Sequence, residues 1–271
     1  MVKVQLLKKV KSEYEVTFLL ENETLEKCLV SEDLVVSYRL LQGKELPIET
    51  YSQFRKDLAI DVFFHKAISY VLKYHKSESE TSDYLEKKEC TKEEISRIIE
   101  KLKKINIIND EILIQSIFDI QIRQKRVGPA KLEYLLKEKG FEESLIRRTL
   151  FSIKTEDINS NLDALFQKKL ISLKHQSISN AKRLAVSYLY QKGYDLNIVQ
   201  AYIISHQDAF SKAIDEDKGL RTEYFRLLKR LDKTELSSPQ KSQKIISSLM
   251  AKGYPYKAIS KILERGQFDE R

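Results

Sequence analysis

Glycine and proline are scarce in this sequence and tryptophan is absent: 271 residues include seven glycines and four prolines. Because these two residues disfavour helix interiors most strongly, their scarcity favours helix through most of the chain. The glycines never cluster as GxGxxG or GxxxxGK[ST], so no nucleotide phosphate cradle is predicted. The histidines His65, His75, His175 and His206 are isolated, without a second ligand four residues on. We therefore predict no metal, no cofactor and no enzymatic activity.

Long apolar runs are also absent, and we expect no leader segment. No stretch approaches the roughly 18 uncharged apolar residues of a membrane helix, and residues 1–5 lack the apolar core of a signal peptide. We therefore expect a cytoplasmic protein with no membrane segment. Cys28 and Cys90 lie far apart in sequence, and a reducing compartment favours two free thiols over a disulfide.

Acidic residues are outnumbered by basic ones, and the imbalance is concentrated in the C-terminal half. Lys and Arg total 48 against 40 Asp and Glu, which gives a net charge of +8. Residues 154–271 carry 21 basic and 14 acidic side chains, whereas residues 1–60 carry 9 and 10. This asymmetry favours a polyanionic partner, either nucleic acid or an acidic protein surface, although it also suits simple solubility.

The first 43 residues are typical of a small sheet followed by a helix. Three β-prone runs, at residues 2–7, 14–20 and 24–30, predict an antiparallel meander. Ser31 followed by two acidic residues is a helix start signal, and Gly43 is a stop signal. We expect no strand beyond Gly43.

An internal repeat organises the rest of the chain. Four seven-residue segments, at 84–90, 135–141, 188–194 and 248–254, have leucine second and lysine fifth. The sixth position is Gly140, Gly193 or Gly253 in three copies and Glu89 in the first. The seventh position is Phe141, Tyr194, Tyr254 or Cys90. The positions six and ten residues beyond the sixth are aliphatic in every copy: Ile95, Ile99, Ile146, Leu150, Val199, Ile203, Ile259 and Leu263.

Each copy is typical of a helix that ends at a left-handed glycine and is followed by a second, amphipathic helix. An amphipathic segment precedes each hairpin, at residues 63–73, 112–124, 162–173 and 222–231. We therefore predict a mainly α fold of four tandem three-helix units after the meander. The expected divisions are residues 1–60, 61–110, 111–153, 154–210 and 211–271. We expect positive φ at Gly140, Gly193 and Gly253.

Three basic sets are candidate partner-binding sites. The first surrounds Gly128-Pro129, where a helix start with free N–H groups could bind an anion, although a solvated turn explains the same pattern. The second joins two pairs of adjacent basic residues, and the third is the most basic helix face, with Arg221 and Lys233 at its ends. For any single residue of the third set, an ordinary solubilising face is the slightly favoured explanation, and it is less favoured for the set as a whole. The candidate residues are Arg123, Lys125, Arg126 and Lys131 in the first set, Arg147, Arg148, Lys182 and Arg183 in the second, and Arg226, Lys229 and Arg230 in the third.

Several motifs lie between residues 61 and 153. Residues 67–85 look like an opening helix followed by an "R-x-[RK]-S-x-x-E-[LV]" turn, with Ser77 and Glu80 in place and His75 instead of arginine. Residues 102–111 are similar to an "L-x-x-x-x-[LI]-[IL]-[ND]-D-[EA]" stretch. Residues 123–131 and 135–141 are similar to "R-x-x-[RK]-x-G-P-x-[KR]" and "L-x-x-K-G-[FIV]" signatures. Together these motifs resemble those of the RecX family of regulators of the RecA recombinase.

The meander and residues 38–44 look like the N-terminal extension of longer, Gram-positive-type members, while residues 154–271 match by repeat pattern. The resemblance implies a monomeric, non-enzymatic regulator that binds RecA filaments on single-stranded DNA. Such a regulator mostly inhibits RecA recombinase, ATPase and co-protease activities in homologous recombination, DNA repair and the SOS response. The alternative is a helical-repeat protein that binds DNA directly, independently of RecA. A nuclease would need a carboxylate cluster that the spacing does not show.

Overall fold

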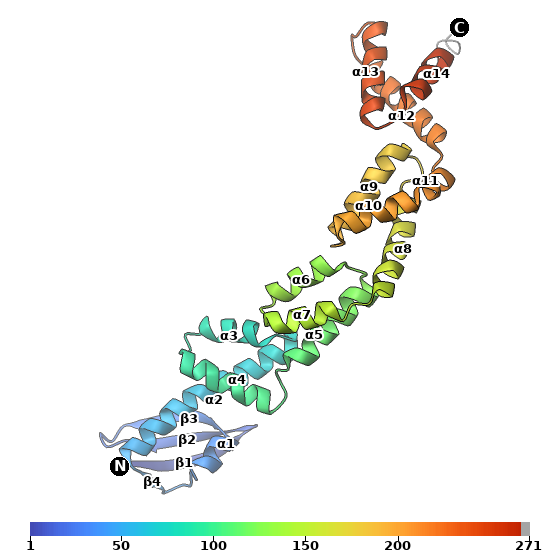
Figure 1. Ribbon diagram of the computed structural model, residues 1–271. Helices are drawn as coiled ribbons and strands as arrows, with labels where there is room; N and C mark the ends of the chain where they lie inside the picture. Colours follow the sequence, from blue (N-terminus) through green and yellow to red (C-terminus); the bar gives the residue numbers. More distant parts are fainter. Residues whose placement is uncertain (267–271) are drawn as a thin grey trace. The chain divides into compact units, whose positions relative to one another are not determined.

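The computed structural model describes residues 1–266, which fall into two units (Figure 1). Unit 1 comprises residues 1–113 and 139–141, and among the described residues unit 2 comprises 114–138 and 142–266. An N-terminal sheet precedes a long series of helices, which confirms the predicted mainly α class.

A four-stranded antiparallel sheet opens unit 1, in the order β3-β2-β1-β4. The strands are β1 (Val2–Val10), β2 (Glu13–Leu19), β3 (Leu25–Ser31) and β4 (Glu45–Leu46). The first three form the predicted meander, but the expectation of no strand beyond Gly43 was wrong. The chain after α1 (Glu32–Ser37) returns alongside β1, where Leu46 pairs with Val2. Leu46 is buried in the sheet core, so one apolar side chain fixes this short strand.

Helix α2 (Ile48–Tyr74) links the sheet to the first repeat (Figure 1). Phe54 and Leu58 pack on the sheet, where the Phe54 and Phe18 rings lie 5.2 Å apart. From Ile60 onward the buried side chains of α2 belong to a second core. The helix ends at His75, whose φ of 47° is left-handed and whose N–H donates to the Val71 carbonyl.

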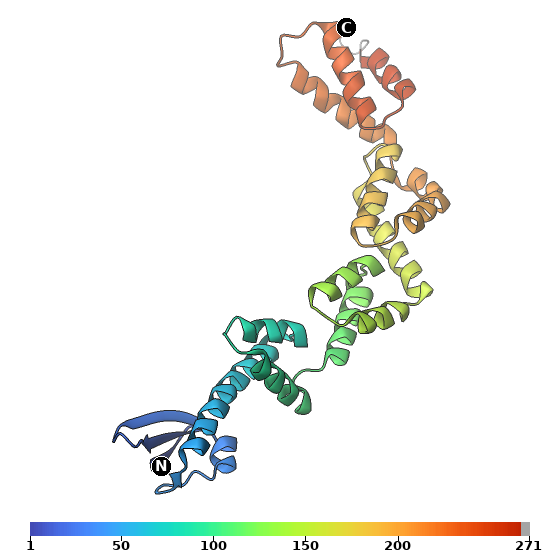
Figure 2. The same cartoon turned by 60° about the vertical axis from the view of Figure 1, so that its left-hand side comes forward.

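The hairpins that the repeat predicts are present, and Figure 2 shows them from a second direction. The helices of unit 1 and of the start of unit 2 are α3 (Glu78–Glu86), α4 (Lys92–Lys104), α5 (Asp110–Phe118), the π-helix η1 (Asp119–Gln124), α6 (Pro129–Glu138) and α7 (Glu143–Phe151). The remaining helices are α8 (Thr155–Ser172), α9 (Ile178–Gln191), α10 (Leu196–Ser205), α11 (Gln207–Ala213), α12 (Glu216–Leu231), α13 (Ser238–Ala251) and α14 (Tyr256–Gly266). The four hairpins are α3–α4, α6–α7, α9–α10 and α13–α14.

Short helix α11 was not predicted. Its Phe210 is fully buried against Phe166 of α8, so this extra turn completes the core of the third repeat. The five-part division of the chain stays a prediction. Three of its boundaries, after residues 60, 110 and 210, fall inside α2, α5 and α11, because helical backbone hydrogen bonding continues across them.

The turn of each hairpin has the predicted geometry. Gly140, Gly193 and Gly253 have φ of 70°, 93° and 82°, and Glu89 takes the same left-handed conformation at 64°. The second-position leucine of each copy is fully buried, and a carbonyl near the end of the first helix accepts a backbone hydrogen bond from the turn, as in Tyr194 N–H to Leu189 O at 3.4 Å. The repeat is therefore a local folding signal: a left-handed helix end that positions the following buried side chain.

Candidate partner-binding surfaces and the joints between repeats

The Gly128-Pro129 helix start is occupied by the turn of the next repeat. The Gly128 N–H donates to the Lys192 carbonyl at 2.7 Å, and the Ala130 N–H donates to the Gly193 carbonyl at 3.1 Å. Of the two interpretations of this helix start, the structure does not support the open anion site, because backbone carbonyls already accept these hydrogen bonds. The Tyr194 hydroxyl adds a third bond, to the Arg126 carbonyl at 3.0 Å. We call this contact a joint.

A joint of the same construction occurs later in unit 2. The Ser177 hydroxyl, at the start of α9, donates to the Lys252 carbonyl at 2.5 Å. The Tyr254 hydroxyl donates to the His175 carbonyl at 3.3 Å. In both joints a helix start meets the fifth-position lysine carbonyl of a turn, and the seventh-position tyrosine reaches the residue two before the helix cap.

Unit 1 contains the third joint. The Ser77 hydroxyl donates to the Lys139 carbonyl at 2.6 Å, and Ser77 also forms a capping box with Glu80. The Glu80 carboxylate accepts from Lys76 at 2.5 Å and from Lys139 at 3.1 Å. Phe141, the aromatic residue of this turn, has no hydroxyl, so the tyrosine bond of the other joints is missing.

Close approach makes the turn glycines necessary at these joints. A Cβ atom on Gly193 would lie 2.4 Å from the Lys131 Cβ, and one on Gly140 would lie 2.2 Å from the Ser79 Oγ. Both distances are far inside van der Waals contact. The glycines thus serve two purposes, a left-handed helix end and room for the preceding repeat.

Polar groups at the joints and beside them have shifted pKa values. Partial burial would raise the pKa of Glu80, but hydrogen bonds from Lys76, the Ser77 N–H and Lys139 outweigh it and lower that pKa. Burial would also raise the pKa of Glu223, but its carboxylate accepts hydrogen bonds from Lys252 and Arg226, and these lower that pKa. Burial raises the pKa of Tyr254 to about 12, so this phenol is protonated and donates near neutral pH.

The first basic set lies around the Gly128 joint. Arg123 lies in the last turn of the π-helix η1 and forms an ion pair with Asp119 at 3.2 Å. Lys125, Arg126 and Lys131 have exposed side chains and no ion pair within residues 1–266. Arg126 has a left-handed φ of 53°, and its carbonyl is the acceptor of Tyr194. The structure therefore places this set together, at the edge of a joint.

The second basic set is divided between two helices. Arg147 and Arg148 are exposed on α7, where Arg147 pairs with Glu143 at 3.4 Å. Lys182 and Arg183 lie on α9 of the following repeat, and Arg183 donates to Asn180 at 2.8 Å. We treat these as two separate pairs.

The third basic set forms a continuous face of α12. Arg226 pairs with Glu223 at 2.7 Å, whereas Lys229 and Arg230 are exposed and have no ion pair among the described residues. Arg221 and Lys229 are two turns apart on one stripe, with Phe225 between them. Phe225 is 62% exposed, so the stripe combines charge with an apolar ring.

Sequence reasoning missed the exposed aromatic residues of these surfaces. Phe151 is 94% exposed at the end of α7, one helical turn after Arg147, and Phe225 occupies the corresponding place among the α12 cations. The signal was available, because both rings lie off the aliphatic stripes that face the core. Exposed aromatic and arginine side chains together are typical of protein interfaces.

Within residues 1–266, no group of three or more His, Cys, Asp or Glu side chains is arranged to hold a metal ion. No helix in that part of the chain is both long and apolar enough to cross a membrane.

Comparisons with known proteins agree on one family name. No family model matches the chain. The chain is 28% identical over 241 residues to the regulatory protein RecX of Oceanobacillus iheyensis, and the alignment covers 89% of this chain and 88% of that protein. It is also 28% identical over 245 residues to the regulatory protein RecX of Enterococcus faecalis, covering 90% and 91%.

Solved structures show the same fold. A crystal structure of regulatory protein RecX aligns with a TM-score of 0.57 at 21% identity, covering 74% of this chain and 98% of that one. RecX from Lactobacillus salivarius aligns with a TM-score of 0.50 at 23% identity, covering 55% and 97%.

Proposed function

We propose that the chain is a member of the RecX family of regulatory proteins and that it acts by binding RecA filaments on single-stranded DNA. In this proposal it has no catalytic activity of its own. It limits filament growth and thereby lowers the recombinase, ATPase and co-protease activities of RecA during DNA repair and the SOS response. It acts in the cytoplasm as a monomer.

The observation that carries the proposal is the α12 face. A filament that contains DNA is polyanionic, and Lys229 and Arg230 present positive charge that no carboxylate in the described chain neutralises. Phe225 in the same stripe offers an apolar anchor to the protein part of such a partner.

The tandem repeats suit a partner that is itself repetitive. Arg126, before α6, Arg147 on α7 and Arg230 on α12 are exposed on three different segments of unit 2, so several weak contacts can form at once. Because the sites are on one chain, the first contact raises the effective concentration of the others, and this gives avidity without any single strong site.

Electron microscopy of RecA filaments on single-stranded DNA, with and without this protein, tests the proposal. We expect the protein to occupy the filaments and RecA ATP hydrolysis to fall as it is added. Without RecA, the protein should hydrolyse no nucleotide. Bare filaments at saturating protein concentration would contradict the proposal.

The alternative function is direct DNA binding without RecA dependence. Both proposed functions use the same basic surfaces. The salt dependence of RecA inhibition and that of DNA binding therefore distinguish them. If inhibition of RecA disappears only where DNA binding disappears, at every salt concentration, direct DNA binding is favoured. If inhibition persists after DNA binding is lost, RecA is the partner.

A further inference from the structure

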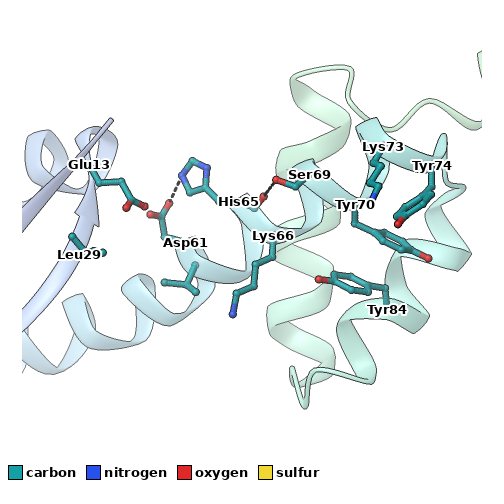
Figure 3. Close-up of a pocket in the computed structure, with 11 residues that line it drawn as sticks. Glu13, Leu29, Asp61, His65, Lys66, Ser69, Tyr70, Lys73, Tyr74 and Tyr84 are labelled. Carbon is teal, nitrogen blue, oxygen red and sulfur yellow. Dashed lines mark hydrogen bonds and ion pairs between the residues drawn. The ribbon is translucent and has the colours of Figure 1, made fainter. Parts of the chain in front are cut away.

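A groove in unit 1 is lined by residues that belong to none of the three basic sets (Figure 3). It has a volume of about 710 Å³ and follows helix α2, with the sheet at one end and α3 at the other. Glu13, Asp61 and His65 lie at the sheet end, whereas tyrosines gather at the α3 end (Figure 3). The two ends of the groove therefore differ in chemistry.

Three tyrosines form a cluster at the α3 end. The rings of Tyr70 and Tyr84 are stacked, with centroids 4.2 Å apart and planes within 8° of parallel. The Tyr74 ring lies 5.7 Å from that of Tyr70 and is tilted by 59°. Tyr74 is 51% exposed, so part of its ring is open to a ligand while the stacked pair supports it.

Lysines surround this cluster. The Lys73 Nζ lies 4.9 Å from the centre of the Tyr74 ring, and the Lys88 Nζ lies 5.9 Å from that of Tyr84. Lys66 lines the same groove. All three lysines are exposed and form no ion pair among the described residues. Lys76, near Tyr70, is different because Glu80 holds it at 2.5 Å.

We propose that the tyrosine end of this groove binds single-stranded nucleic acid. Aromatic rings that stack with bases, bordered by cations that contact the backbone, are the combination that recognises such a strand without regard to sequence. Tyr74 provides the stacking surface, and Lys66, Lys73 and Lys88 contact the phosphates.

The carboxylates at the sheet end set the limit of the site. Asp61 is 8% exposed, and His65 lies 3.8 Å from its carboxylate oxygen. Phosphates are repelled from Asp61 and Glu13, so the strand passes over the tyrosines and not along the whole groove. Acidic peptides would meet the same lysines but would gain little from Tyr74, and this difference allows a test.

The site does not depend on the proposed RecA function, and its test uses the full chain without RecA. The probe is a short fluorescein-labelled oligothymidylate, and binding is followed by anisotropy over a range of salt concentrations. Tyr74→Ala should weaken binding on the order of tenfold. Lys66→Gln/Lys73→Gln/Lys88→Gln should reduce the slope of log affinity against log salt by about 2.

Matched controls separate this groove from general surface effects. Tyr190→Ala removes another exposed tyrosine, and Lys92→Gln/Lys104→Gln/Lys212→Gln removes the same charge from exposed lysines elsewhere. Neither control should change the affinity as the groove variants do. Equal losses in variants and controls would overturn the site.

Cross-linking and peptide competition test the site in two further, independent ways. An oligothymidylate carrying 5-iodouracil should cross-link to the peptide that contains Tyr74, and cross-links confined to unit 2 would contradict the proposal. A polyglutamate peptide should compete poorly. If it displaces the oligonucleotide as well as unlabelled oligothymidylate does, and Tyr74→Ala has no effect, the groove is an acidic-peptide site instead. Loss of RecA inhibition has no bearing on these results.

Discussion

The backbone N–H of Gly128 donates to the carbonyl oxygen of Lys192 at 2.7 Å, across 64 residues of sequence. Through this bond the start of α6 is held against the turn of the following repeat. Ser77 and Ser177 make the equivalent contact through their hydroxyl groups to Lys139 and Lys252. The joints differ in the donor atom but share the acceptor, which is the carbonyl of the lysine before the turn glycine.

Replacing Gly193 tests how tightly this joint is packed. Gly193→Ala introduces a Cβ into a left-handed position, which costs about 1–2 kcal/mol, and forces Lys131 to move, which costs about 1–3 kcal/mol more. Gly43→Ala is the matched control, because Gly43 has a φ of 87° but no neighbour within 4 Å. Thermal unfolding followed by circular dichroism should show the larger loss for Gly193→Ala. Equal losses would mean that the joint is loose.

Removing the Ser177 hydroxyl tests the serine joints. Ser177→Ala loses a helix cap, worth about 0.5–2 kcal/mol, and leaves the Lys252 carbonyl without this donor. Ser31→Ala removes a cap that joins no repeats, since Ser31 accepts only from Leu34 within its own helix start. Hydrogen exchange should therefore speed up in the α9 start and in residues 252–254 for Ser177→Ala. Unchanged exchange in those turn residues would count against the joint.

Acid should weaken the unit 1 joint. The folded-state pKa of Glu80 is lowered, so its contribution to stability is fully present above the ordinary carboxyl pKa of about 4.3 and is lost as pH falls through the lower folded value. Glu80→Gln should thus destabilise the protein at pH 7, and the difference from wild type should shrink below about pH 4.5. Glu86→Gln, an exposed change on the same helix, serves as the control. A pH-independent difference would show that Glu80 acts only through packing.

The sequence predicted those features that depend on neighbours along the chain. The positive φ of Gly140, Gly193 and Gly253 follows from a helix end that precedes a buried aromatic residue, and this geometry is local. The aliphatic stripe that includes Ile146 and Val199 is likewise a consequence of helical period, and both residues are buried.

Features that depend on distant parts of the chain were not predictable in this way. Gly128-Pro129 has the pattern of an anion-binding helix start, and only the fold brings the Lys192 carbonyl to it. Strand β4 exists because Leu46 reaches the sheet core, not because of its own two-residue pattern. The groove of Tyr70, Tyr74 and Tyr84 combines two helices, and its tyrosines have no fixed spacing in sequence.

Charge reversal on α12 separates the partner surface from the scaffold. Lys229 and Arg230 are exposed and form no ion pair in the described chain, so Lys229→Glu/Arg230→Glu should change stability by only about 0.5 kcal/mol while it weakens filament binding. Leu136→Ala, in the fully buried stripe of α6, should instead cost roughly 2–5 kcal/mol. Both variants are measured for melting temperature and for inhibition of RecA ATP hydrolysis. The α12 variant should lose inhibition at a nearly unchanged melting temperature, whereas Leu136→Ala should lose melting temperature first.

If the α12 variant inhibits RecA as wild type does at every salt concentration, this face is only solubilising. Lys125→Glu/Arg126→Glu, at the edge of the Gly128 joint, then becomes the decisive variant.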